Sequence, residues 1–393
     1  MPIQPCAAGP GFGRTALLPA LAIGIIACAE PETNAAAAPG SVYGAVEVAR
    51  TLGTVEFGGI SAVDVDSRGR ILVGDGGEVV VLSPNATVER RIGRQGHGPG
   101  EFQYIATVTA LARDSVFVYD PGLRRITVYP PGSAKPAYST QISSGQTTLP
   151  YWARPAGGRG QIVAAFKTAR GDVPERKKGV APAEVLRLLN PDGSVVRDSL
   201  VLMPEMQMLN IDNVEGRGVL HYPFARHSVF ALSRRGVVYH GWTDSLRFSA
   251  YGLDGRRLRE FHVPHTPRAV SSQELDSVVQ KLSKDRFSAA TVRRALEGTR
   301  TRTWPAFQSF FVDDQERLWV ALTPASDDAD LEWLVLGSSG QRLGSLRLPQ
   351  SVTLGTVRGD RAYAVARDEN DVESIVVYQL TSTPGATVAK AGQ

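Results

Sequence analysis

The sequence predicts an all-β chain that folds as a six-bladed β-propeller, with four-stranded blades and a small helical insertion. Three observations predict this fold. Short apolar runs recur with a base period of 45 residues, each run follows a polar turn, and each unit repeats the same order of strands. A unit of this length matches one four-stranded propeller blade.

One valine marks each repeated run. These anchor valines lie at intervals of 45, 45, 75, 82 and 45 residues, and they are Val73, Val118, Val163, Val238, Val320 and Val365. The two long intervals carry insertions. Within a unit, an inner strand leads through a polar turn into the anchor strand. A third strand, a hairpin of Gly, Pro, Asn or Asp, and a polar outer strand then complete the blade.

The first connection between blades is rich in glycine and reads "GRQGHGPGEF" from Gly93 to Phe102. A dinucleotide-binding loop would need a third glycine where Glu101 stands, and a helix after it. Pro99 also lacks the amide donor that a phosphate cradle uses, and a strand pattern follows. The stretch is therefore predicted to turn the chain between two blades.

This connector, together with "VDVDSRGRILVGD" from Val63 to Asp75, resembles the NHL repeat of six-bladed propellers. The resemblance is close over residues 58–130 and looser in the later units, where the glycine connector is missing. It implies the propeller fold. It constrains function little, because propellers of this kind include scaffolds, ligand binders and a few enzymes.

The last blade has two candidates for its outer strand. One is the segment Gly44–Gly53 near the amino terminus, and the other is the carboxy-terminal stretch "TPGATVAKA". We favour the amino-terminal segment, because a strand from the start of the chain would lock the ring and leave fewer exposed edges.

Residues 1–27 resemble a bacterial lipoprotein signal peptide, and residues 28–42 a flexible tether. The apolar run Ala16–Ile26 has 11 residues, which is too short to cross a bilayer as a helix but is typical of a signal-peptide core. The run Ile25–Cys28 resembles the lipobox, which implies lipidation of Cys28. We expect an extracytoplasmic protein with a lipid anchor in a bacterial membrane, and we favour the outer membrane. Residues 43–393 would then form the propeller.

The helical insertion is predicted at about residues 271–300. Ser271 and Glu274 have the spacing of a capping box, and the apolar residues Leu275 and Val278 follow at helical spacing. The resulting apolar stripe has two interpretations. It packs on the protein's own domain, or it forms a docking face for a partner protein in the cell envelope.

Aromatic side chains gather where four inner strands are expected to begin. In a propeller these positions would converge on one mouth of the central channel, with Arg154 nearby, and form a partly polar funnel. We therefore predict a funnel that binds a peptide, a glycan or a small molecule. Its predicted ligand-binding residues are Tyr104, Tyr151, Trp152, Tyr222, Arg226 and Trp304.

Composition and motifs exclude several function classes. A net charge of +4 with scattered arginines argues against nucleic-acid binding. Only Cys6 and Cys28 occur, both ahead of the propeller, so its body has neither a disulfide nor a thiolate metal site. No HExxH or G-x-S-x-G motif is present. We therefore assign no catalytic residue, no metal ligand and no cofactor, although calcium stays open.

The sequence thus favours a binding or scaffold protein over an enzyme. The alternative is a metal-dependent propeller hydrolase or lactonase, which would hold a divalent ion between carboxylates and amides at the channel centre. The residues available for that role are Asp64, Glu101, Asn210 and Asp212.

Overall fold

The computed structural model describes residues 41–51, 55–142, 150–157, 160–167, 183–214, 216–284, 287–299, 301–326 and 329–383. The signal peptide, Cys28, the tether as far as residue 40, and the last ten residues lie outside the described residues.

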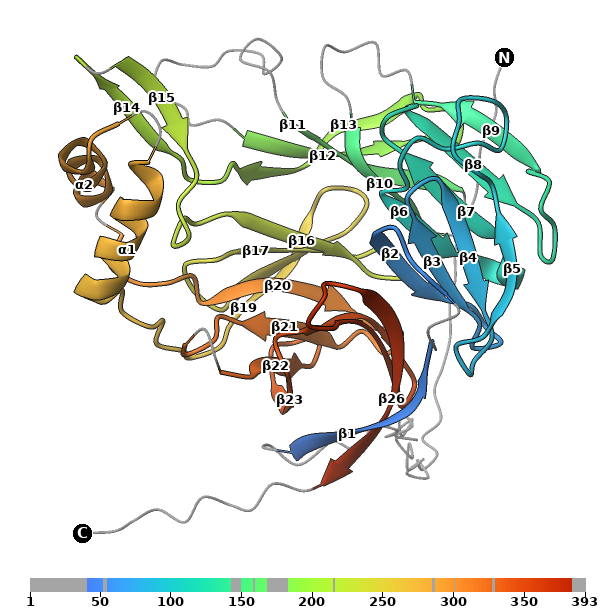
Figure 1. The fold of residues 1–393 in the computed structure, drawn as a ribbon. Helices are drawn as coiled ribbons and strands as arrows, with labels where there is room; N and C mark the ends of the chain where they lie inside the picture. Colours follow the sequence, from blue (N-terminus) through green and yellow to red (C-terminus); the bar gives the residue numbers. More distant parts are fainter. Residues whose placement is uncertain are drawn as a thin grey trace, which may run out of the picture. The chain divides into compact units, whose positions relative to one another are not determined.

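Six blades surround one central axis, and each is an antiparallel sheet of four strands (Figure 1). Blade 1 is β2 (Ile60–Val65), β3 (Ile71–Asp75), β4 (Glu78–Leu82) and β5 (Val88–Ile92). Blade 2 is β6 (Thr107–Ala110), β7 (Val116–Asp120), β8 (Arg125–Tyr129) and β9 (Tyr138–Gln141). Blade 3 is β10 (Pro150–Ala156), β11 (Gln161–Lys167), β12 (Ala183–Leu189) and β13 (Val195–Pro204).

Blade 4 is β16 (Ser228–Leu232), β17 (Val238–Trp242), β18 (Arg247–Tyr251) and β19 (Arg257–His262). Blade 5 is β20 (Phe307–Val312), β21 (Leu318–Leu322), β22 (Leu331–Leu336) and β23 (Arg342–Leu348). Blade 6 is β24 (Val352–Arg358), β25 (Arg361–Arg367), β26 (Glu373–Thr383) and β1 (Ser41–Arg50). Every anchor valine lies in the second strand of its blade, so the predicted fold class is confirmed.

The amino-terminal strand β1 closes the ring. It pairs antiparallel with β26, from Val42 opposite Thr383 to Arg50 opposite Val376. Its first two residues also pair in parallel with Gly344 and Ser345 of β23, which joins blades 5 and 6 into one continuous sheet (Figure 1). The prediction that the amino-terminal segment completes the last blade is confirmed.

Each blade packs against both of its neighbours, because successive side chains of a strand point to opposite faces. In β3, Leu72 belongs to the apolar cluster shared with blade 2, whereas Val73 belongs to the cluster shared with blade 6. Clusters of the same kind fill the other four junctions between blades. This explains why the anchor strands are mostly apolar on both of their faces.

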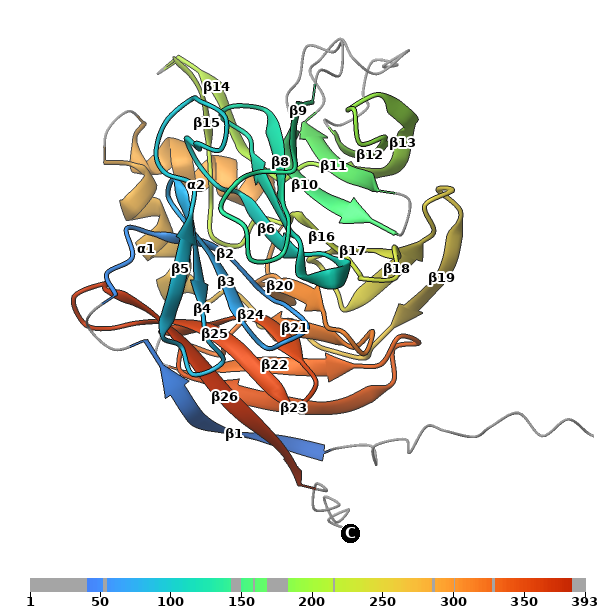
Figure 2. The same ribbon diagram turned by 90° about the vertical axis from the view of Figure 1, so that its right-hand side faces the viewer.

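The insertion between blades 3 and 4 forms a hairpin, and the predicted helical insertion, between blades 4 and 5, forms two helices. The hairpin is β14 (Leu209–Asn213) and β15 (Gly216–Leu220), and it precedes blade 4; α1 (Ser272–Leu282) and α2 (Ala289–Gly298) follow blade 4. Ser271 and Glu274 form the predicted capping box. Figure 2 shows both helices beside the hairpin.

The apolar stripe of α1 packs within the protein, as the first interpretation predicted. Val278 and Val279 share a cluster with Leu209 and Ile211 of the hairpin and with Val292 of α2. Within the described residues, no helix is long and apolar enough to cross a membrane. The hairpin was not predicted, because its short strands lack the turn signals that mark a blade.

Candidate anion-binding site

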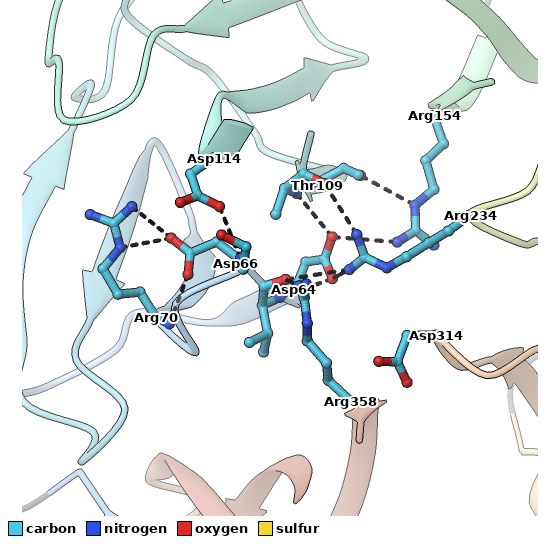
Figure 3. Close-up of polar contacts among 12 residues, drawn as sticks. Asp64, Asp66, Arg70, Thr109, Asp114, Arg154, Arg234, Asp314 and Arg358 are labelled. Atoms are coloured by element: carbon cyan, nitrogen blue, oxygen red, sulfur yellow. Dashed lines mark hydrogen bonds and ion pairs between the residues drawn. The ribbon is translucent and has the colours of Figure 1, made fainter. Parts of the chain in front are cut away.

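The inner strands β2, β6, β10, β16, β20 and β24 surround the central channel and all run in the same direction. We call the side where they begin the start face, and the side where they end the end face. The end face carries the turns that lead into the second strands. The polar side chains described next lie inside the channel near this end face (Figure 3).

Asp64 lies at the centre of this group, and its side chain is 1% exposed. One carboxylate oxygen, Oδ1, accepts from the backbone N–H of Val65 at 2.9 Å, and Oδ2 accepts from that of Ala110 at 2.9 Å. These amides come from blades 1 and 2. They stabilise the ionised carboxylate and fix its position on the channel wall.

Two arginines from other blades reach Asp64. Arg234, from the turn after β16 in blade 4, places Nη2 2.6 Å from Oδ1. Arg154, from β10 in blade 3, places Nη2 3.6 Å from Oδ2. Arg154 is also held by Thr109 of blade 2, whose hydroxyl accepts from Nε at 3.2 Å.

A third arginine approaches from blade 6. Arg358, the last residue of β24, donates from Nη1 to the carbonyl oxygen of Val65 at 2.6 Å. Arg234 donates to the carbonyl oxygen of Ala110 at 3.2 Å. Backbone carbonyls therefore orient these guanidinium groups without neutralising them. Arg154 and Arg234 thus share the carboxylate of Asp64, and Arg358 donates to a backbone carbonyl in the residue next to it.

Burial is unfavourable for a charged guanidinium group, and the pKa of Arg154 shows this effect. Burial lowers the pKa of the Arg154 guanidinium group. The negative charge of Asp64 raises this pKa, and the positive charge of the neighbouring Arg234 lowers it further. A guanidinium group nevertheless stays protonated in proteins. An anion bound beside Arg154 and Arg234 would relieve their repulsion, so the site is prepared to attract negative charge.

Two cavities meet at these arginines. A cavity of about 390 Å³ opens at the end face, and its lining includes Ser67, Thr109, Arg154, Arg234 and Arg358. A second cavity of about 250 Å³ lies on the start-face side. Arg154, Leu232 and Arg234 line both cavities. The arginines thus form a partition across the channel.

The turns at the end face are themselves held by carboxylates. Asp66 accepts from Nε of Arg70 at 2.7 Å and from its backbone N–H at 2.9 Å, which fixes the turn of blade 1. Asp114 of blade 2 accepts from the backbone N–H of Ser67 at 2.9 Å (Figure 3). These bonds join the rims of neighbouring blades and keep the cavity wall rigid.

The structure places the six residues of the predicted aromatic funnel in different parts of the fold. Trp152 lines the start-face cavity and packs edge-on to Phe230, with ring centroids 5.0 Å apart. Tyr104 is 51% exposed in the loop before β6, and the Tyr151 hydroxyl donates to Glu184 at 2.6 Å.

The other three predicted residues belong to the insertion. Tyr222 and Trp304 pack in its apolar cluster, each edge-on to Phe224. Arg226 is 7% exposed and donates to the hydroxyl of Thr303 at 2.6 Å. The physical reason is that the residues before β16 and β20 connect the blades to the hairpin and the helices. Their aromatic rings are therefore buried in the apolar cluster of the insertion and do not face the channel.

The residues considered for a divalent metal do not converge. Asn210 and Asp212 lie on β14 in the insertion, and Glu101 pairs with Arg94 in the glycine-rich connector. Asp64 is in the channel, but N–H donors occupy both of its oxygens. Within the described ranges no group of three or more His, Cys, Asp or Glu could hold a metal. These residues do not fit a calcium ion, which needs several oxygen ligands.

A signal for the arginine cluster was present in the sequence. Asp64, Thr109 and Arg154 lie nine residues before the anchor valines of blades 1, 2 and 3, and are therefore 45 residues apart. Equivalent positions of successive blades face the same level of a channel. A polar residue at this position in three consecutive units could have indicated the site. Arg234 and Arg358 could not have been found this way, because they lie at other positions in their units.

No known protein family and no curated protein matches the sequence of this chain. Its fold is similar to that of a DUF4221 family member from Bacteroides vulgatus, with a TM-score of 0.54 and 10% identity over 87% of this chain and 99% of that one. It is also similar to a Bacteroides fragilis protein classed as exported, with a TM-score of 0.51 and 10% identity over 90% and 97% of the two chains. These likenesses support the six-bladed propeller fold.

Proposed function

We propose that this protein is an extracytoplasmic binding protein that holds an anionic ligand on Arg154, Arg234 and Arg358, at the end-face mouth of its channel. One observation carries the proposal. Three arginines line a cavity of about 390 Å³; two of them, Arg154 and Arg234, share one carboxylate, Asp64, and the third, Arg358, donates to a backbone carbonyl. A structural ion-pair network would give each arginine its own carboxylate, whereas Arg154 and Arg234 share Asp64 and Arg358 has a backbone carbonyl as its partner.

The chemistry of the ligand follows from the donors. A guanidinium group offers planar, paired N–H donors that match a carboxylate, a sulfate or a phosphate. Ser67 and Thr109 also line the cavity, and their hydroxyls could bind neutral polar groups of the same ligand. The volume is within the range of small-molecule sites. Trp152, on the other side of the partition, would then contact only a ligand that enters from the start face.

The cellular location is part of this proposal. The signal-peptide pattern and the lipobox-like run ending at Cys28 favour export and a lipid anchor, and one protein of similar fold is classed as exported. Replacing Cys28 with alanine should release the protein from the membrane fraction and prevent labelling by a radioactive fatty acid. Unchanged labelling would overturn the anchor. A partner protein on α1 and α2 stays a prediction.

The binding proposal is tested by calorimetry and thermal melting of the purified protein with sulfate, phosphate or acetate at millimolar concentration. We expect at least one anion to bind and to raise the melting temperature. The variant R234Q should lose most of that effect. Its neighbour Arg235 is the matched control: its side chain is 76% exposed and approaches Glu316 at 4.0 Å, outside the cavity lining.

The variant R235Q should therefore bind the anion as the unmodified protein does. Sodium chloride at equal ionic strength controls for general screening. If no anion binds the unmodified protein, the proposal is overturned. Equal loss in R234Q and R235Q would also contradict it, because the effect would then come from net charge alone.

A further inference from the structure

A fourth arginine lines the end-face cavity, away from Asp64. Arg113 belongs to the short turn Ala112–Asp114 between β6 and β7, and its residue is exposed at the rim. Within the described part of the chain, its guanidinium group makes no hydrogen bond or ion pair. It therefore presents an uncompensated positive charge to the same cavity that Arg154, Arg234 and Arg358 line at the floor.

From this arrangement we infer that the ligand carries two anionic groups, one bound by the floor arginines and the other by Arg113. The inference rests on the proposed function and deepens it, because it names the ligand class: a short dianion, of which an α,ω-dicarboxylate is the simplest example. A ligand with one anionic group on the floor would leave Arg113 unpaired.

The backbone at Arg113 supports a role for its side chain. Its φ is 60° and that of Asp114 is 61°, so two consecutive residues other than glycine adopt the left-handed region. Residues other than glycine adopt this region at an energetic cost, because Cβ comes too close to the carbonyl oxygen. Strained conformations of this kind persist where the surrounding structure enforces them, which happens most often at ligand sites.

The equivalent turns of other blades show that this strain is not needed to build the turn. Blade 1 uses one positive-φ residue, Gly69, and blade 4 uses one, Gly236, at the position that Asp114 occupies in blade 2. Blade 5 has Glu316 there. In these three turns the residue that corresponds to Arg113 is not among the positive-φ residues. Among these four turns, the extra left-handed residue occurs in blade 2.

Asp114 holds the turn in this form. Its carboxylate accepts from the backbone N–H of Ser67 at 2.9 Å and lies 3.3 Å from Nε of Arg68, both in blade 1. Its backbone N–H donates to the carbonyl oxygen of Leu111 at 3.2 Å. The adjacent blade thus clamps the residue that follows Arg113, and Arg113 is presented at the rim before any ligand arrives.

The cavity between Arg113 and the other three arginines has room for a chain that links the two anionic groups of the ligand. A cavity of about 390 Å³ is far larger than the roughly 30 Å³ that one water molecule occupies in the liquid, so a single small anion would fill only part of it. Leu111 and Pro155 supply apolar wall, and Ser67 supplies a hydroxyl. A short chain with or without polar substituents fits this lining.

The test compares dicarboxylates of four to eight carbons with their half-amides, using calorimetry on the purified protein. Each half-amide has the same length as its dicarboxylate and one negative charge fewer. We expect the best dicarboxylate to bind about tenfold more tightly than its half-amide, the effect of one charge-assisted contact. In R113Q this preference should fall to about twofold or less, while the half-amide binds as before.

Arg124 provides the matched control. It is an exposed arginine in blade 2 with a φ of 53°, and it is absent from the cavity lining. R124Q should retain the full preference for the dicarboxylate. Thermal melting of both variants checks folding, and R113G, which also relieves the left-handed strain, should melt no lower than R113Q while lacking the preference.

The outcomes separate the two proposals. Equal binding of dicarboxylates and half-amides, unchanged in R113Q, would overturn the two-ended ligand and leave the anion site standing. Loss of half-amide binding in R113Q would also overturn it, because Arg113 would then belong to a single anion cluster. If only inorganic anions bind, the dianion inference fails. If no anion of any kind binds, both proposals fall.

Discussion

Asp64 and Arg234 join opposite walls of the propeller channel, with Oδ1 of the aspartate 2.6 Å from Nη2 of the arginine. Asp64 belongs to blade 1 and Arg234 to blade 4, and the two residues are 170 positions apart in the chain. In a ring of six blades these two face each other. The pair therefore braces the ring across its diameter and divides the channel into its two cavities.

The variant D64N should be less stable than the unmodified protein, by about 1–3 kcal/mol, because it leaves the arginine donors without their charged acceptor. It should also bind sulfate more tightly, since the carboxylate no longer competes for Arg154 and Arg234. Thermal melting with and without millimolar sulfate measures both effects.

The double variant D64N/R234Q is the control for coupling. Its loss of stability should be smaller than the sum of the two single losses, because the second change removes the unpaired charge that the first creates. Strict additivity would show that the pair contributes nothing across the channel.

Asp313 should be a strong determinant of stability in blade 5. Its carboxylate is fully buried, lies 2.5 Å from Nε of Arg317, and accepts from the indole N–H of Trp319 at 2.8 Å. In D313N an amide replaces one acceptor oxygen and leaves Arg317 unpaired. We expect a loss of about 3 kcal/mol in the free energy of unfolding by urea.

Asp254 is the comparison for that variant. It accepts from the backbone N–H of Arg256 at 3.0 Å in an exposed turn of blade 4. D254N should cost less than about 1 kcal/mol. Similar losses in the two variants would mean that turn geometry, rather than the buried Arg317 pair, stabilises blade 5.

His240 should make stability depend on pH. Burial lowers the pKa of its imidazole from 6.5 to about 4. The neutral ring contributes stability above the unfolded pKa of 6.5, and this contribution is lost as pH falls through the folded pKa. Between pH 6.5 and 4 the unmodified protein should lose up to about 3 kcal/mol more than H240Q does.

Urea unfolding at half-unit steps of pH measures this difference. Nε2 of His240 lies 3.1 Å from the hydroxyl of Ser228, a contact that glutamine can imitate in part. H262Q serves as the control, because His262 is exposed at the end of β19. A parallel pH dependence in the unmodified protein and in H240Q would show that His240 does not titrate in this window.

Ring closure by β1 should dominate the stability of blade 6. Tyr43 of β1 packs on Trp319 with ring centroids 5.6 Å apart, and the Thr51 hydroxyl accepts from the backbone N–H of Ile375 at 3.0 Å. A chain that begins at residue 52 should melt at a much lower temperature than one that begins at residue 41. The second chain should melt as the full chain does.

A chain that ends at Thr383 tests the rejected alternative for closure. It should melt normally, because β1 already occupies the edge of β26 that a carboxy-terminal strand would need. A large loss on removing residues 384–393, with none on removing β1, would contradict the closure by β1.

Much of the fold could be predicted because its signals are local. The alternation of Leu72 and Val73 between two clusters, the capping box of Ser271 and Glu274, and the glycine turns at Gly69 and Gly236 depend on residues close in the chain. The repeat period and the turn residues together indicate the number of blades and the order of their strands.

The residues of the predicted aromatic funnel lie apart for a physical reason that the sequence does not show. Tyr222 and Trp304 stand where inner strands are about to begin, but the residues around them also anchor an insertion with its own apolar cluster. Burial of a ring in the nearer core is more favourable than its exposure in a channel. Position along a repeat therefore did not decide which way these side chains point.

By itself the sequence determined a six-bladed propeller with a helical insertion, because periodicity, capping and turn residues act over short distances. Only the tertiary structure decided where charge accumulates. Asp64, Arg154, Arg234 and Arg358 come from four blades and become neighbours when the ring closes. These residues come into contact because their side chains reach across the channel. Their separation in the sequence does not indicate that contact.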